Sequence, residues 1–212
     1  MTISDIVTTR AYVYSGLLLA VALLLVGCSD DSPKLSPLAQ NAVILAFGDS
    51  LTQGTGAGRG DSYPNHLAEL SGRKVINAGI AGELSAAGLS RLPNLLAEHS
   101  PSIVILCHGG NDLLRKLDER KLYDNLSAMI NQIDQSGAEV VFLGVPKPAL
   151  LLGPADVYER LASEFRLVSN LKILSKILSQ PKLKSDPVHP NAAGYRQLAQ
   201  AVHATLSAAG AY

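Results

Sequence analysis

The sequence predicts an α/β fold of three layers, in which helices cover both faces of a central parallel sheet. Apolar segments typical of strands alternate with segments of helical spacing from residue 42 to the C-terminus. The expected strand at 102–107 is continuously apolar after its first residue, which is typical of strands buried on both faces. The chain has 212 residues, 47% of them hydrophobic, which suits one globular domain with its own core.

The first half of the domain is expected to contain three strands and two helices. Asp61 or Ser62 can cap the first helix, which has Pro64 in its first turn. The second helix carries leucines at helical spacing and is expected to break near Pro93. In order, we expect a strand at 42–47, a helix at 63–70, a strand at 74–78, a helix at 84–99 and a strand at 102–107.

The second half is expected to continue the alternation of helices and strands. Its first helix has apolar residues spaced by four, four and three positions and ends at Gly137. The segment 166–183 is the hardest to assign, and Asn191 caps the final helix. In order, we expect a helix at 117–136, strands at 139–144 and around 171–174 with a helix at 155–165 between them, and a helix from 192 to about 208.

The composition excludes several classes of function. Lysine plus arginine and aspartate plus glutamate both number 18, and no basic stripe suggests a nucleic-acid partner. No HExxH motif or cluster of cysteine and histidine predicts a metal site, and we expect no cofactor. The two cysteines, Cys28 and Cys107, do not suggest a disulfide framework. We expect a monomer.

The N-terminus carries an uncharged apolar run at 17–27, which is too short to span a bilayer as a helix but suits a signal peptide. The run ends in Leu-Val-Gly before Cys28, which resembles a bacterial lipobox. The resemblance implies cleavage before Cys28 and its lipidation, and Ser29 implies sorting to the periplasmic face of the outer membrane. The alternatives are an ordinary secretory signal or an uncleaved anchor. The expected parts are a signal peptide at 1–27, a polar tether at 28–40 and the domain at 41–212.

Four loops carry residues suited to chemistry. Ser50 directly follows the first strand, Gly82 follows the second and Asn111 follows the third. Because the carboxyl ends of parallel strands meet at one edge of a sheet, these three residues are expected there. Asp186 and His189 lie in the loop before the last helix. Taken alone, the stretch around Ser50 is as typical of an ordinary turn as of a functional site. Gly82 alone is more often a turn glycine, and the motifs that carry Asn111 and Asp186 are common loop compositions.

Four sequence blocks resemble, in the same order, those of the SGNH (GDSL) hydrolase superfamily. They are Gly-Asp-Ser-Leu at 48–51, the lone glycine Gly82, Gly-Gly-Asn-Asp at 109–112 and Asp-Pro-Val-His at 186–189. The likeness is greatest to the bacterial periplasmic thioesterase, lysophospholipase and arylesterase branch. It implies a flavodoxin-like sandwich and a serine esterase. Glu83 departs from the branch, which often has aspartate there, and 166–183 aligns poorly.

The resemblance implies a role for each block, and each residue type suits its role. His189 would take the proton of the Ser50 hydroxyl, and Asp186 would orient the imidazole. The backbone N–H groups of Ser50 and Gly82 and the side-chain amide of Asn111 would form the oxyanion hole.

Other polar residues have plainer interpretations. His108 could line the site or could be a packed or capping histidine, and Cys107 is expected to be an inert buried thiol. Asp49 and Asp112 are expected to bond loop backbone. The histidines on predicted helices are expected at the surface; they are His66, His99 and His203.

The substrate class stays open between two kinds of ester. The three leucines at 150–152 could line a groove for an acyl chain or could simply pack beneath their loop. A groove would favour lysophospholipids, acyl esters or acyl thioesters, whereas an open polar cleft would favour O-acetyl groups on envelope carbohydrate. A third hypothesis is an envelope lipoprotein that binds lipid or a partner without catalysis.

Overall fold

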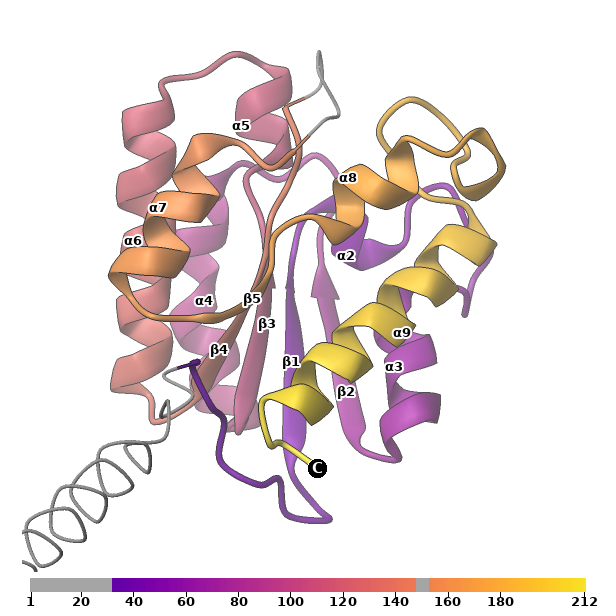
Figure 1. The fold of residues 1–212 in the computed structure, drawn as a ribbon. Helices are drawn as coiled ribbons and strands as arrows, with labels where there is room; N and C mark the ends of the chain where they lie inside the picture. The colour runs from indigo at the N-terminus through magenta and orange to yellow at the C-terminus, as the bar shows by residue number, and fades with distance from the viewer. Residues whose placement is uncertain (1–31, 148–152) are drawn as a thin grey trace, which may run out of the picture. The chain divides into compact units, whose positions relative to one another are not determined.

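A five-stranded parallel sheet lies at the centre of the protein, as seen in a computed structural model that describes residues 32–147 and 153–212 (Figure 1). The strands lie in the order β2-β1-β3-β4-β5. Their bounds are Val43–Gly48 for β1, Lys74–Gly79 for β2, Ile103–Cys107 for β3, Glu139–Leu143 for β4 and Val168–Asn170 for β5. The parallel sheet predicted from the sequence is confirmed.

Helices pack on both faces of this sheet and complete the three predicted layers (Figure 1). On one face, α9 packs against α3 and α8, and on the other face α6 packs against α4 and α7. These helices are α3 Tyr63–Ser71, α4 Ser85–His99, α6 Glu119–Gln135, α7 Asp156–Glu164, α8 Ile173–Leu178 and α9 Ala192–Ala208. Three shorter elements join them: α2 Ser50–Gln53, α5 Gly110–Leu114 and the 3₁₀ turn η1 Pro181–Leu183.

The strand order creates a crevice at the carboxyl edge of the sheet. Strand β1 lies between β2 and β3, so the chain leaves β1 toward one side and later returns on its other side. The register pairs Gly48, the last residue of β1, with Gly79 of β2 and Cys107 of β3. The three strands therefore end level with one another, at the kind of switch point where open α/β sheets bind ligands.

Apolar side chains from the sheet and the facing helices form the core. Every residue of β3 is buried, which explains why its sequence is continuously apolar rather than alternating. Helix α6 places one stripe of apolar residues against the sheet: Leu122, Leu126, Met129, Ile130 and Ile133. None of the described helices is both long enough and apolar enough to span a bilayer.

Two predicted elements are corrected. Helix α4 continues through Pro93 instead of breaking there, because the surrounding turns pack against the sheet and α6. The fifth strand lies at Val168–Asn170, before the predicted 171–174. The apolar residues that suggested a strand belong to α8, where Ile173, Leu174, Ile177 and Leu178 are all buried.

The second half of the expected tether is part of the folded unit, which begins at Pro33. Leu35 is only 8% exposed and belongs to the core, and its N–H donates to the carbonyl of Ala209 over 2.8 Å. The N–H of Leu38 donates to the carbonyl of Ala211 over 2.9 Å. The predicted signal peptide at 1–27 and the predicted lipidation site Cys28 lie outside the described residues.

Candidate active site

Ser50 is the first residue of α2 and lies directly beyond β1, at the carboxyl edge. It is 9% exposed. The preceding Asp49 caps this short helix, because its carboxylate accepts the N–H of Leu51 over 3.1 Å. Gly48 permits the tight approach of β1 to β3, since a Cβ there would lie 2.0 Å from the carbonyl oxygen of Cys107. The turn thus holds the serine in a fixed place.

His189 lies beside Ser50 although the two residues are 139 positions apart in the sequence. Its Nε2 is 2.9 Å from the Ser50 Oγ, and its Nδ1 is 2.7 Å from Oδ2 of Asp186. Because an ionised carboxylate only accepts, Nδ1 carries the ring proton and Nε2 is left to accept from the serine hydroxyl. The arrangement can therefore withdraw a proton from Ser50.

Asp186 is held ionised by the loop in which it lies. Its burial acts to raise the pKa, but three hydrogen bonds outweigh that effect and lower the pKa of the carboxyl below its ordinary value. The donors are the imidazole of His189 and the backbone N–H groups of Val188 and His189, the latter two at 2.8 Å. The loop thus fixes a negative charge behind the imidazole.

The two remaining predicted residues lie on neighbouring loops at the same edge. Asn111 is the second residue of α5, and its Nδ2 donates to the carbonyl of Glu83 over 3.0 Å. Gly82, the residue before Glu83, has a φ of 75°, a conformation that L side chains rarely adopt. Asn111 lines a pocket together with Ser50 and His189, whereas Gly82 adjoins that pocket through its neighbour Glu83.

Asp49 and Asp112 bond loop backbone, as predicted. The carboxylate of Asp49 is buried, which raises its pKa, and it accepts the N–H of Gly110 over 3.1 Å as well as that of Leu51. Asp112 accepts the backbone N–H of Ser85 over 2.9 Å. Asp49 therefore joins the loop after β1 to the loop after β3, and Asp112 joins α5 to the start of α4.

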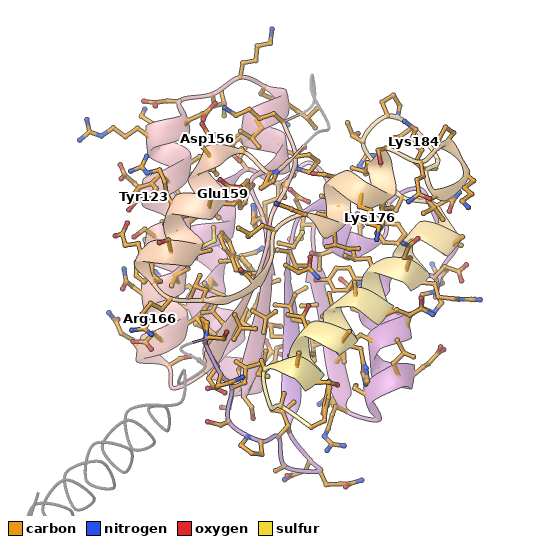
Figure 2. All side chains as sticks on the ribbon, in the orientation of Figure 1. Tyr123, Asp156, Glu159, Arg166, Lys176 and Lys184 are labelled. Carbon is orange, nitrogen blue, oxygen red and sulfur yellow. The ribbon has the colours of Figure 1, made fainter. Side chains whose placement is uncertain are left out.

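The walls of the pocket are largely apolar. Its polar members are Asp49, Ser50, Asn111 and His189. The apolar side chains come from α2, α5, α8 and the loops after β4 and before α9: Leu51, Leu114, Val145, Pro146, Leu178 and Val188. The three leucines at 150–152 lie outside the described residues. Two lysines near these elements do not line the pocket: Lys176 on α8 and Lys184 after η1 (Figure 2).

A buried charged cluster beneath the loops was not predicted from the sequence. The carboxylate of Glu83 accepts hydrogen bonds from Arg91 and from His108. Burial acts to raise the pKa of Glu83, but these bonds outweigh it and lower the pKa to about 2. Two features of the sequence could have indicated this cluster. They are a glutamate at position 83, where aspartate was expected, and a histidine, His108, at the end of an apolar strand.

Other side chains are placed as follows. Cys107 is a buried free thiol, as predicted, and burial raises its pKa. The expectation that His66 lies at the surface is wrong, because α3 turns it inward and leaves it 7% exposed. In the described ranges, no group of three or more histidine, cysteine, aspartate and glutamate side chains could hold a metal ion.

Comparison with known proteins finds relatives that are ester hydrolases. Residues 46–197 match the GDSL-like Lipase/Acylhydrolase family. Esterase TesA of Pseudomonas aeruginosa is 34% identical over 200 residues, which cover 87% of this chain and 97% of the relative. Thioesterase 1/protease 1/lysophospholipase L1 of Escherichia coli K12 is 30% identical over 70% of this chain and 75% of its own.

Solved structures show the same fold. The crystal structure of TesA superimposes with a TM-score of 0.70 at 29% identity and covers 79% of this chain and 99% of that one. The SGNH-hydrolase family esterase AlinE4 gives a TM-score of 0.62 at 32% identity, over 82% of this chain and 100% of its own. A two-domain esterase active on acetylated mannans, 20% identical with a TM-score of 0.67, shares the fold.

Proposed function

The chain belongs to the GDSL-like lipase/acylhydrolase family, and we propose that it hydrolyses carboxylic esters with Ser50 as nucleophile, His189 as base and Asp186 as its partner. Its relatives are named esterase, arylesterase and thioesterase, so the protein is an ester hydrolase. The observation that carries the proposed roles is the pair of hydrogen bonds from Ser50 to His189 and from His189 to Asp186, at 2.9 and 2.7 Å.

The reaction proceeds in two half-reactions. His189 Nε2 takes the hydroxyl proton as the Ser50 Oγ forms a bond to the carbonyl carbon of the ester, and the carbonyl electrons move onto its oxygen. When this intermediate collapses, the C–O bond to the alcohol breaks and His189 gives its proton to the departing oxygen. Water then repeats these steps on the acyl-enzyme, releasing the acid and restoring the serine.

Three donors stabilise the negative oxygen of the tetrahedral intermediate. They are the N–H groups of Ser50 and Gly82 and the side-chain amide of Asn111. In the described residues, neither backbone N–H donates to another protein group. Each donor in such a site contributes about 3 kcal/mol to the stability of the transition state.

The apolar pocket beside Ser50 favours an ester with a hydrocarbon acyl chain. Leu114, Val145, Leu178 and Val188 line the same pocket as Ser50 and His189. Burial of each CH₂ in such a pocket contributes roughly 0.8 kcal/mol to binding. Acyl esters, lysophospholipids and acyl thioesters all present such a chain, and the relatives' names include each activity class.

Deacetylation of envelope carbohydrate is the second candidate. The observation that favours it is the likeness to an esterase active on acetylated mannans, but at 20% identity that likeness extends to the fold alone. An acetyl group would leave most of the apolar wall unused.

The test is hydrolysis of p-nitrophenyl esters from acetate to palmitate by the full chain and by Ser50→Ala. We expect a preference for medium or long chains, and loss of about 10³-fold or more in kcat in the variant. Asn131→Ala on the exposed side of α6 is the matched control and should retain full activity. An unchanged Ser50→Ala rate would overturn the proposed nucleophile.

The same series separates the candidates for substrate. Turnover of acetate alone, together with release of acetate from an acetylated oligosaccharide, would favour the carbohydrate reaction. Turnover of lysophosphatidylcholine or of an acyl-CoA would identify the lipid or thioester class. A folded protein that hydrolyses none of them would revive the hypothesis of a binding lipoprotein.

We further propose that Cys28 is lipidated and anchors the mature chain at the periplasmic face of the outer membrane. The lipobox-like run before Cys28 supports this proposal. Incorporation of labelled fatty acid into the full chain, but not into Cys28→Ser, is the expected result. Equal labelling of both would exclude this residue as the site.

A further inference from the structure

Glu83 and His108 form a buried pair directly behind the two loops that carry Gly82 and Asn111. The Nε2 of His108 lies 3.0 Å from Oε2 of Glu83, and the two side chains are 0% and 6% exposed. Arg91 of α4 completes the cluster, because its Nε and Nη2 each donate to the same carboxylate over 2.7 Å. A buried carboxylate with such donors is held in one orientation.

The imidazole of His108 is fixed on its other side as well. The N–H of Gly109 donates to its Nδ1 over 2.9 Å, so the ring proton lies on Nε2 and is directed at Glu83. Gly88 of α4 leaves space for this ring, since a Cβ there would lie 2.4 Å from Nε2. The ring of Phe47 packs against it with centroids 5.7 Å apart. The pair therefore has little freedom to move.

Glu83 connects this cluster to both proposed oxyanion donors. It follows Gly82 in the chain, and its own carbonyl accepts the Nδ2 of Asn111. Because a carbonyl only accepts, the contact fixes which end of the Asn111 amide is the donor end and leaves its second N–H for a ligand. His108, on the partner loop, lies three residues before Asn111.

Arg91 extends the connection to the strand ends. Its Nη2 donates to the carbonyl of Ala78 in β2 over 2.8 Å and to that of Gly48 in β1 over 3.2 Å. One cluster thus joins the carboxyl ends of β1, β2 and β3, which carry the three loops of the site.

We propose that Glu83 and His108 are positioning residues that hold the Gly82 N–H and the Asn111 amide in register with Ser50. This inference rests on the proposed oxyanion roles of Gly82 and Asn111. Neither side chain lines the pocket, so each acts through the loops and not on the substrate. Their loss should slow the chemical step and leave binding of the acyl chain almost unchanged.

The first test compares kcat and KM for the best p-nitrophenyl ester in the full chain and three variants. Glu83→Gln and His108→Leu should each lower kcat about tenfold and change KM less than about threefold. His108→Gln, which can still donate to Glu83, should keep kcat within about threefold of the wild-type value. The control is Glu139→Gln, whose carboxylate binds Ser36 at the opposite edge of the sheet; it should leave kcat unchanged.

The second test is a double-mutant cycle with Asn111→Ala, which alone should lower kcat by about 10²-fold. If His108 acts through Asn111, adding His108→Leu to the Asn111→Ala variant should lower kcat by less than about threefold. Circular dichroism at the assay temperature verifies that each variant is folded. If His108→Leu does not fold, Glu83→Gln combined with Asn111→Ala takes its place in the cycle.

Three outcomes would overturn the inference. If the loss of kcat in the double variant equals the product of the losses in the two single variants, His108 acts independently of Asn111. Equal losses in His108→Gln and His108→Leu would mean that donation to Glu83 is irrelevant. A normal kcat in Asn111→Ala would remove the oxyanion role itself and the positioning role with it, whereas a slow Asn111→Ala beside a normal His108→Leu would remove only the positioning role.

Discussion

Glu83 makes the stability of the protein sensitive to acid. Burial acts to raise its pKa, and the hydrogen bonds from His108 and Arg91 outweigh that and lower the pKa from 4.5 to about 2. A carboxyl with a lowered folded-state pKa stabilises the fold above its unfolded pKa, and this contribution is lost as pH falls through the folded value. The loss of this contribution should extend from about pH 4.5 to about pH 2.

Urea unfolding between pH 6 and pH 2.5 measures this contribution. Glu83→Gln should be less stable than wild type at pH 6, and the difference between the two should shrink as the pH falls. Glu139→Gln, which removes a carboxylate at the other end of the sheet, is the control, and its curve should run parallel to that of the wild type. Parallel curves for wild type and Glu83→Gln would contradict the expectation.

The Asp186 carboxylate should matter far more for the rate of ester hydrolysis than for the stability of the fold. Its pKa is lowered by hydrogen bonds from His189 and from backbone N–H groups, which outweigh the effect of its burial, so it stays ionised at neutral pH. Asp186→Asn should lower kcat by about 10³- to 10⁴-fold, because an amide no longer selects the required tautomer. Asp118→Asn, at the cap of α6, is the matched loop control and should keep kcat within about twofold.

The residues of the site differed in how far the sequence could predict them. Ser50, His189 and Asp186 were predicted because each belongs to a short motif, and the structure places them in contact. The bond between Glu83 and His108 could not be predicted, because it joins loops after β2 and β3, which are separated by β1. Only the strand order brings the two side chains together.

Helix α4 carries a proline that the fold tolerates at a cost. Pro93 lies inside the helix and is exposed, and it cannot donate to the carbonyl of Leu89 four residues earlier. Pro93→Ala should therefore raise the free energy of unfolding by about 1–3 kcal/mol without loss of core packing. Thermal and urea unfolding measure this change.

Pro64 is the matched control, because it lies in the first turn of α3, where an N–H has no helical partner. Pro64→Ala should give no gain in stability. A gain in both variants, or in neither, would show that the position within the helix is not the cause.

The elements themselves were predicted unevenly. The first four strands lie within one residue of their expected bounds, because β1, β3 and β4 are apolar runs and β2 pairs with β1 along its whole length. Strand β5 has three residues and one buried side chain, Val168, so its position depends on backbone pairing with β4. Its apolar neighbours in α8 gave a stronger signal than the strand did.

For the molecule as a whole, the segment before β1 is part of the folded unit. Leu35 is buried, and backbone bonds from Leu35 and Leu38 reach the chain beyond α9. A chain that begins at residue 41 should be less stable than one that begins at residue 33 by about 2–4 kcal/mol. Urea unfolding of the two fragments measures the difference in stability. Leu35→Ala in the longer fragment should cause part of the same loss of stability. Equal stabilities would contradict the expectation.

That segment also enters the domain at the end of the sheet opposite Ser50, the proposed nucleophile. Ser36 binds Glu139 at the start of β4, and the carbonyl of Leu38 accepts from Arg73, just before β2. The polypeptide thus enters the domain at the amino edge of the sheet, whereas Ser50 lies beyond the carboxyl edge (Figure 1). A lipid anchor at Cys28, as proposed, would therefore connect to the domain at the edge of the sheet opposite Ser50, and the connection would leave the pocket open to an entering ester.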